Sequence, residues 1–133
     1  MVQHNDSEYR DSYVLMKFYM QRCPFCIDFQ PEWNKLVEHY QNQSNILLAV
    51  IEGPKNPKIR QRYKIRGYPE VLFLYKGTKG LKAKTFDGGE RDFDEIKEWV
   101  DENIEEFEEQ QREREAAKNR KEPKIEDVDT LNG

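Results

Sequence analysis

The sequence has 133 residues, a length that fits one domain of ordinary size. Hydrophobic and charged residues each make up 36% of it. Average soluble domains have about 45–50% hydrophobic and about 25% charged residues, so part of the chain is expected to lie outside a packed core. The net charge of −4 excludes a general nucleic-acid binder. A run of about 18 apolar residues is absent, which excludes a membrane-spanning helix, and the first residues do not resemble a signal peptide.

The C-terminal part of the chain has a different composition from the rest. Residues 101–133 carry 12 acidic and 6 basic side chains. Three apolar side chains larger than alanine follow residue 107: Ile125, Val128 and Leu131. We therefore expect a loose N-terminus over residues 1–11, one domain over 12–107 and a charged appendage over 108–133. The appendage is predicted to be helical at first and disordered from Pro123 onward. A tail that binds a partner is the alternative to a solvated spacer.

The first half of the domain predicts a strand, a helix and a second strand. Ser12–Met20 is rich in β-branched and aromatic residues, which favours a strand. Six later side chains recur at the spacing of one helical face: Cys26, Phe29, Trp33, Leu36, Val37 and Tyr40. Pro24 suits the first position of this helix, and Pro31 predicts a kink. His39 is expected on its surface. The continuous apolar run Ile46–Ile51 predicts a buried parallel strand.

The second half predicts a short helix, a hairpin and a last helix. The short helix covers Pro57–Tyr63, and the strands Val71–Lys76 and Lys82–Asp87 are joined as an antiparallel hairpin. Asp92 and Glu95 resemble a capping box that opens the last helix. Its predicted buried stripe is Phe93, Ile96, Trp99, Val100, Ile104 and Phe107. The order β-α-β-α-β-β-α predicts an α/β fold with a four-stranded mixed sheet and helices on both faces.

Cys23 and Cys26 form a C-x-x-C pair between the first strand and its helix. Cys23 would lie at the helix N-terminus, where unpaired N–H groups and the helix dipole favour a thiolate and lower its pKa. Cys26, three residues on, would lie on the same side of the first turn, near the spacing that a disulfide bridges. The prediction is an exposed, acidic Cys23 that attacks a disulfide and a sheltered Cys26 that resolves the mixed disulfide.

Two other interpretations of the pair are weaker. Half of a zinc site would need two more ligands, and no second C-x-x-C or close histidine pair supplies them, with His4 in the predicted loose N-terminus. An inert structural disulfide would close a loop too short to contribute much stability. No bound cofactor is predicted, because the disulfide itself holds the electrons.

Four segments of the chain form a recognisable pattern: FYMQRCPFC, QPEW, NPKIRQRYKIRGYPEV and FDGGERDFDEIKEWV. Together they resemble the thioredoxin superfamily, most closely a protein disulfide isomerase catalytic domain. The resemblance covers roughly residues 12–104 and implies a thioredoxin-like fold. It also implies that Pro69 follows a cis peptide bond and that the backbone of Tyr68 pairs with a substrate strand. Phe25 would be an exposed apolar contact beside the reactive sulfur.

Several positions depart from the superfamily's pattern. Lys17 occupies the place of an acid that normally lies below the second cysteine, and its charge would favour a thiolate. Glu52 is a candidate partner of Lys17 and a substitute proton acceptor, while a Lys17 side chain extended to solvent is the alternative. Arg22 replaces a tryptophan. Arg91 resembles the isomerase arginine that approaches the second cysteine, but it lies one residue further along.

Two more departures are similar to glutaredoxins. The inner dipeptide is Pro-Phe, and the superfamily's first strand and helix have no counterpart before the first predicted strand. This implies a minimal, glutaredoxin-like topology or a truncated chain. The protein would be cytoplasmic if the chain is complete and would lie in the endoplasmic reticulum lumen if it is a fragment of a disulfide isomerase.

The resemblance implies a thiol–disulfide oxidoreductase that reduces, forms or isomerises protein disulfides through Cys23 and Cys26. One alternative is a glutaredoxin that uses glutathione, although the proline loop reads Gly-Tyr-Pro rather than Thr-Val-Pro. Another is a non-catalytic module that holds clients or an iron–sulfur cluster. The expected partners are protein thiols and disulfides, with glutathione or a reductase as a further candidate. Neither nucleic acid nor membrane is an expected partner, and the chain is expected to be a monomer.

Overall fold

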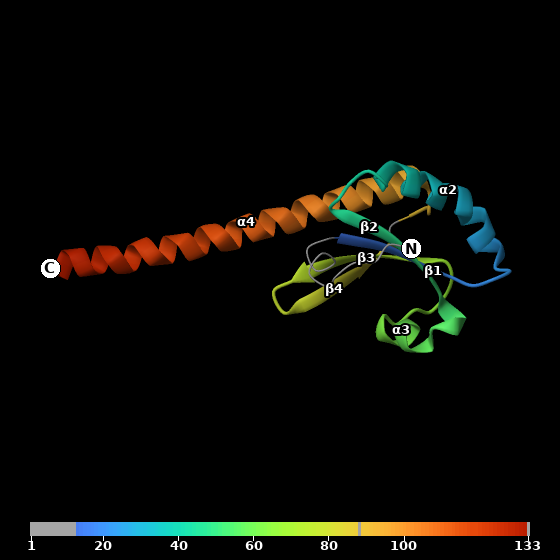
Figure 1. Cartoon of the computed structure of the whole chain (residues 1–133), viewed down its shortest axis with the longest axis horizontal. Helices are drawn as coiled ribbons and strands as arrows, with labels where there is room; N and C mark the ends of the chain where they lie inside the picture. The colour runs from blue at the N-terminus through green and yellow to red at the C-terminus, as the bar shows by residue number, and fades with distance from the viewer. Residues whose placement is uncertain (1–12, 88, 133) are drawn as a thin grey trace. The chain divides into compact units, whose positions relative to one another are not determined.

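The computed structural model describes the backbone of residues 13–87 and 89–132, and the side chains of residues 13–87 and 89–119. In chain order the elements are β1 (Tyr13–Tyr19), α2 (Pro24–Tyr40), β2 (Ile46–Glu52), the 3-10 helix η1 (Gly53–Lys55), α3 (Pro57–Arg62), β3 (Glu70–Gly77), β4 (Gly80–Thr85) and α4 (Phe93–Asn132) (Figure 1). The predicted order of strands and helices is confirmed. The predicted loose N-terminus and His4 lie outside the described residues.

The four strands form one mixed sheet in the order β2-β1-β3-β4. β1 is parallel to β2, with Tyr13 opposite Ile46, and antiparallel to β3. β3 and β4 form the predicted hairpin, in which Gly77 pairs with Gly80. Gly80 has a φ of 121°, in the region that favours glycine, so this residue suits the tight turn. The predicted four-stranded mixed sheet is therefore confirmed.

Helices cover both faces of the sheet. Successive side chains of a strand point to opposite sides, so the sheet presents apolar side chains on each face for a helix to pack against. On one face, Phe18 lies in a buried cluster that includes Ile65 and is joined by Ile59 of α3. On the other face, Phe73 of β3 contacts Trp99 of α4 edge-on, with ring centroids 6.2 Å apart. The helix α2 lies over this second face, and Figure 1 shows α2 and α3 on opposite sides of the sheet. None of the described helices combines the length and apolarity that a membrane crossing needs.

The prediction of a buried strand over Ile46–Ile51 is wrong in one respect. β2 is parallel to β1 as predicted, but it is an edge strand of the sheet. Only Ile46 is fully buried, and the Val50 side chain is 52% exposed. An apolar run predicts burial on both faces, but an edge strand has a neighbour on one side only, so part of this run stays exposed.

The helix α4 continues to Asn132, where the sequence predicts disorder from Pro123 onward. An α-helix satisfies its backbone hydrogen bonds internally, so a helix of charged residues can extend without burying apolar surface. Tertiary contacts divide the chain into two units, residues 1–100 and residues 101–133. This division does not test the predicted domain boundaries, which stay predictions.

Candidate active site

Cys23 is the N-cap residue of α2, as the sequence predicts. Its backbone is extended, with φ −84° and ψ 117°, and Pro24 begins the helix. The Cys23 Sγ accepts a hydrogen bond from the backbone N–H of Cys26 at 3.3 Å, so a sulfur takes the place of the usual capping oxygen. Arg22, just before it, has a φ of 63°, and this left-handed conformation turns the chain from β1 into the helix.

The pKa of the Cys23 thiol lies below its ordinary value. The largest cause is a hydrogen bond from the Cys26 side chain, and burial opposes it. The backbone N–H groups of Cys26 and Phe25 and the positive charge of Arg91 lower this pKa further. The hydrogen bonds and the charge of Arg91 stabilise the thiolate form of Cys23.

The pKa of Cys26 is shifted in the opposite direction. Burial raises it most, and the hydrogen bond and charge of Cys23 raise it further. The backbone N–H of Met20 and the charge of Lys17 lower it in part. The predicted chemical difference between the two sulfurs is therefore confirmed in direction.

The prediction that Cys23 is exposed is wrong. Cys23 is 5% exposed and Cys26 is 8% exposed, so their accessible surfaces are nearly equal. A loop from the other half of the chain lies against Cys23, whose Sγ donates a long hydrogen bond of 3.7 Å to the Tyr68 carbonyl oxygen. The hydrogen bonds that the Cys23 sulfur accepts from Cys26 and Phe25 and the charge of Arg91, rather than contact with water, lower the pKa of this thiol.

The loop beside Cys23 has the geometry that the resemblance implies. The Tyr68–Pro69 peptide bond is cis, and Pro69 is buried. The Tyr68 ring packs so closely on Gly53 that a Cβ there would overlap the ring and its hydroxyl. This hydroxyl is buried without a hydrogen-bond partner among the described residues. Phe25 is 65% exposed, and its role as an apolar contact beside the sulfur stays a prediction.

Lys17 is buried, so the alternative of a side chain extended to solvent is wrong. The residue is 5% exposed, and its Nζ donates a hydrogen bond to Gln30 Oε1 at 3.0 Å. The ammonium also lies 5.1 Å from the centre of the Trp33 ring and 5.6 Å from that of Tyr19. Burial lowers the Lys17 pKa, and the charge of Cys26 opposes that shift. Lys17 therefore acts on Cys26, not on Cys23.

The predicted partnership of Glu52 with Lys17 is wrong. The Glu52 carboxylate accepts a hydrogen bond from the Lys55 backbone N–H at 2.9 Å and caps η1. Glu52 lies opposite Tyr19 at the end of the parallel pair, whereas Lys17 lies opposite Val50. The end of the strand thus directs the carboxylate to the next turn of the chain.

The resemblance implies that Arg91 approaches the second cysteine, Cys26. In the structure its charge acts on the first cysteine, Cys23, and lowers the pKa of that thiol. The pKa of Glu70 is raised by burial, and the charges of Arg66 and Arg91 offset part of that rise. Sequence reasoning missed Glu70, although a carboxylate directly after Pro69 is a signal that could have indicated it.

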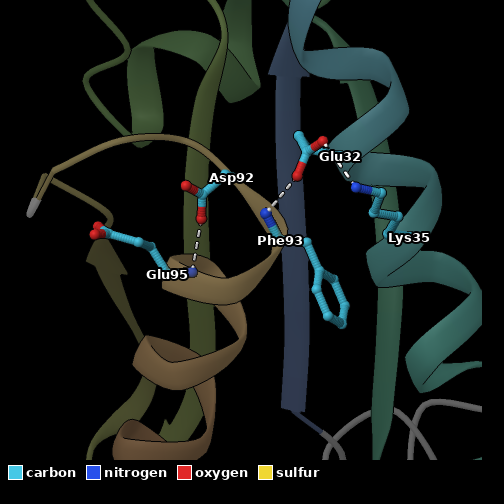
Figure 2. Close-up of polar contacts among 5 residues, drawn as sticks. All are labelled: Glu32, Lys35, Asp92, Phe93 and Glu95. Atoms are coloured by element: carbon cyan, nitrogen blue, oxygen red, sulfur yellow. Dashed lines mark hydrogen bonds and ion pairs between the residues drawn. The ribbon is translucent and has the colours of Figure 1, made fainter.

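Glu32 is a second residue that sequence reasoning missed. Its Oε1 accepts a hydrogen bond from the Phe93 backbone N–H at 2.8 Å, and its Oε2 pairs with Lys35 Nζ at 3.2 Å (Figure 2). The same first turn of α4 is capped by Asp92, whose Oδ1 accepts from the Glu95 N–H at 2.9 Å. Glu32 therefore links the cysteine-bearing helix to the loop that carries Arg91.

The described part of the chain contains no group of three or more His, Cys, Asp or Glu side chains that could hold a metal ion. The two cysteines are free thiols. The chemistry that these residues themselves can perform is exchange between a dithiol and a disulfide, with one acidic and one protonated sulfur.

Comparison with known proteins agrees with this geometry. The family described as Thioredoxin matches residues 3–102. Human protein disulfide-isomerase A4 is 31% identical over 90 residues, which are 68% of this chain and 14% of that protein. A thioredoxin domain-containing protein from Theileria parva is 32% identical over 85 residues, 64% of this chain and 36% of that protein. The chain thus spans a small part of the length of these curated relatives.

Solved structures show the same fold. The first thioredoxin domain of mouse protein disulfide-isomerase A4 is 28% identical, with a TM-score of 0.60, over 74% of this chain and 71% of that one. The Trx4 domain of ERdj5 has a TM-score of 0.63 at 20% identity, over 71% of this chain and 82% of that one.

Proposed function

The chain belongs to the thioredoxin family, and from this membership we propose that it is a thiol–disulfide oxidoreductase that reduces, forms or isomerises protein disulfides through Cys23 and Cys26. The observation that carries the proposal is the opposite shift of the two pKa values, down for Cys23 and up for Cys26. Exchange needs one sulfur that is a thiolate before substrate arrives and one that keeps its proton until the mixed disulfide has formed.

In the reducing direction, the Cys23 thiolate attacks one sulfur of a substrate disulfide. An S–S bond forms between Cys23 and the substrate, and the other substrate sulfur leaves as a thiolate that takes a proton from water. Cys26 then loses its proton and attacks Cys23 Sγ, which releases the second substrate thiolate and leaves a Cys23–Cys26 disulfide. Two electrons pass from the protein to the substrate, and the reverse sequence oxidises a substrate dithiol.

The surroundings of Cys23 support a protein substrate. The Tyr68 carbonyl oxygen lies beside the Cys23 sulfur, where a backbone N–H of an extended substrate strand can bind it. Phe25 offers an exposed apolar surface next to this position. We assign Tyr68, Pro69 and Phe25 to substrate docking, and Arg91 and Lys17 to tuning the first and second sulfur.

Single-cysteine variants test this proposal. Cys26→Ser should accumulate a mixed disulfide with a disulfide-bonded protein such as insulin, whereas Cys23→Ser should trap little, because its remaining thiol is protonated. Cys23 has the lowered pKa, so in the wild type iodoacetamide should label Cys23 first at pH values below the ordinary thiol pKa. Mass mapping checks both results.

Two outcomes would contradict the assignment of roles. Preferential labelling of Cys26 would reverse the two sulfurs. Trapping without turnover by the wild type would identify a client-binding module instead of an enzyme, and turnover that requires glutathione would identify a glutaredoxin.

A further inference from the structure

A cleft of about 340 Å³ opens between α2 and the β1–β2 edge of the sheet. Neither cysteine lines it, and neither does the Tyr68–Pro69 loop. Its polar lining is Lys17 from β1 with Gln30 and Asn34 from α2, and its apolar lining includes Val37 and Val50. Val37 is 39% exposed and Val50 is 52% exposed, so these apolar surfaces are open to a ligand.

The hydrogen bonds inside the cleft run in one direction. Lysine can only donate, so Lys17 Nζ requires the oxygen of Gln30, and the Gln30 Nε2 then donates to Asn34 Oδ1 at 2.8 Å. The side-chain oxygens of Gln30 and Asn34 therefore each accept one hydrogen bond already. The capacity that remains is mainly that of donors: N–H groups of the ammonium and of the two amides.

The charge of Lys17 has no carboxylate partner among the described residues. Its ammonium contacts a neutral amide oxygen and the faces of two aromatic rings. The rings offset part of the cost of burying an ammonium, but an ion pair would offset more of it. A cleft with a buried cation, unused donors and exposed apolar walls is complementary to an anion attached to an apolar group.

We propose that this cleft binds a small monocarboxylic acid. The carboxylate lies against Lys17 Nζ and the side-chain amides of Gln30 and Asn34, and the hydrocarbon part lies against Val37 and Val50. The volume of the cleft fits a ligand of this size. A carboxylate suits the site better than a divalent anion, because the described residues that line it supply one cation, the Lys17 ammonium.

A bound carboxylate would also change the chemistry of Cys26, an effect that rests on the proposed function. Lys17 acts on Cys26 through its charge, and a carboxylate beside the ammonium offsets that charge. Resolution of the mixed disulfide by Cys26 should then slow when the cleft is occupied, while attack by Cys23 should continue at its usual rate.

The binding test is an NMR titration with 4-methylpentanoate, with 4-methylpentan-1-ol as the uncharged control. The carboxylate should produce saturable shifts of the Trp33 indole and of the Gln30 and Asn34 side-chain amides. The alcohol should bind at least about tenfold more weakly. Lys17→Met should also weaken carboxylate binding about tenfold or more, while Lys79→Met, a control at the exposed hairpin turn, should bind like the wild type.

A second variant guards against a folding defect in Lys17→Met. Gln30→Leu changes an exposed position of α2 and leaves the Lys17 ammonium in place. It should weaken carboxylate binding by a smaller factor than Lys17→Met does. Equal shifts with acid and alcohol, unchanged affinity in Lys17→Met, or no saturable shift would each overturn the proposal. Tighter binding of a tripeptide with a C-terminal leucine would overturn the assignment to a free acid.

The kinetic effect distinguishes this inference from the proposed function. The acid should slow resolution by Cys26 in the wild type and leave the rate of Lys17→Met unchanged. Saturable binding by a protein that has no dithiol activity would support the carboxylate site and contradict the proposed function. Dithiol activity without saturable binding of the acid would support the proposed function and contradict the carboxylate site.

Discussion

Two cationic residues each act on one of the two sulfurs. The Arg91 guanidinium lowers the pKa of Cys23, and the Lys17 ammonium lowers that of Cys26. Cys26 nevertheless has a raised pKa, because its burial outweighs the charge of Lys17. Near neutral pH Cys26 therefore holds its proton, and Lys17 has most influence at the moment when this proton leaves.

This position of Lys17 predicts a kinetic effect rather than a large change in potential. In Lys17→Met the Cys26 pKa should rise further, so the pH profile for resolution of a mixed disulfide should move to higher pH and the rate at neutral pH should fall several-fold. The redox potential near pH 7 should move by less than the ~30 mV that corresponds to 1.4 kcal/mol, because Cys26 is a neutral thiol there. Stopped-flow kinetics and a glutathione equilibrium measure these quantities. An unchanged pH profile would show that Lys17 has no role in resolution.

Gly53 is a residue at which one added methyl group should alter the site. A Cβ at this position overlaps the Tyr68 ring, so Gly53→Ala should displace Tyr68 and the carbonyl that contacts Cys23. We expect exchange with a protein disulfide to slow more than alkylation by iodoacetamide, because the small reagent does not need the docking loop. Gly67→Ala is the matched control, since a Cβ there meets no atom within 4 Å. Equal behaviour of the two variants would contradict this prediction.

At the scale of elements, the start of α4 is held by two carboxylates from different parts of the chain. Asp92 caps the helix locally, and Glu32 reaches the same turn from α2 (Figure 2). The hydrogen bond from the Phe93 N–H lowers the pKa of Glu32. The predicted capping box is confirmed in its Asp92 half only, because the Asp92 N–H donates to the Glu90 carbonyl oxygen.

Loss of the local cap should destabilise the domain measurably. Asp92→Ala should lower the free energy of unfolding by about 1 kcal/mol, while Asp92→Ser, which retains a capping oxygen, should lose much less. Urea unfolding followed by circular dichroism measures both variants. Equal losses in the Ala and Ser variants would mean that the side chain of residue 92 does not cap α4.

At the scale of the whole molecule, the chain consists of two units, residues 1–100 and residues 101–133. The cysteines, the Tyr68–Pro69 loop and the Lys17 cleft all belong to the first unit. The second carries an excess of acidic side chains and few apolar ones. Phe107 of this unit is buried, but residues 108–133 have a composition that can bury little surface, so we expect them to contribute little to the stability of a folded domain.

Removing the last residues should therefore leave the first unit intact. A chain that ends after Arg120 should keep its melting temperature within about 1 °C and retain its rate of dithiol exchange, because the deleted segment can bury little apolar surface. Differential scanning calorimetry and an insulin-reduction assay test the two statements. A loss of several degrees would show that residues 121–133 pack on the domain.

The sequence by itself determined the order of elements and the position of the reactive pair. Alternating and helical periodicities, the proline at the start of α2 and the glycines of the hairpin are local signals, and each predicted its element within a few residues. Cys23 at the N-cap followed from the same local pattern, which is why the direction of its pKa shift could be predicted without a structure.

Only the tertiary structure decided which groups surround the two sulfurs. The carbonyl oxygen of Tyr68, which lies 45 residues beyond Cys23, contacts that sulfur, and Gln30 rather than Glu52 binds Lys17. The exposure of Val50 likewise depends on its place at the edge of the sheet. Local periodicity records which face of an element is apolar, but not which distant segment packs against it. That choice depends on strand order and on how the helices cross the sheet.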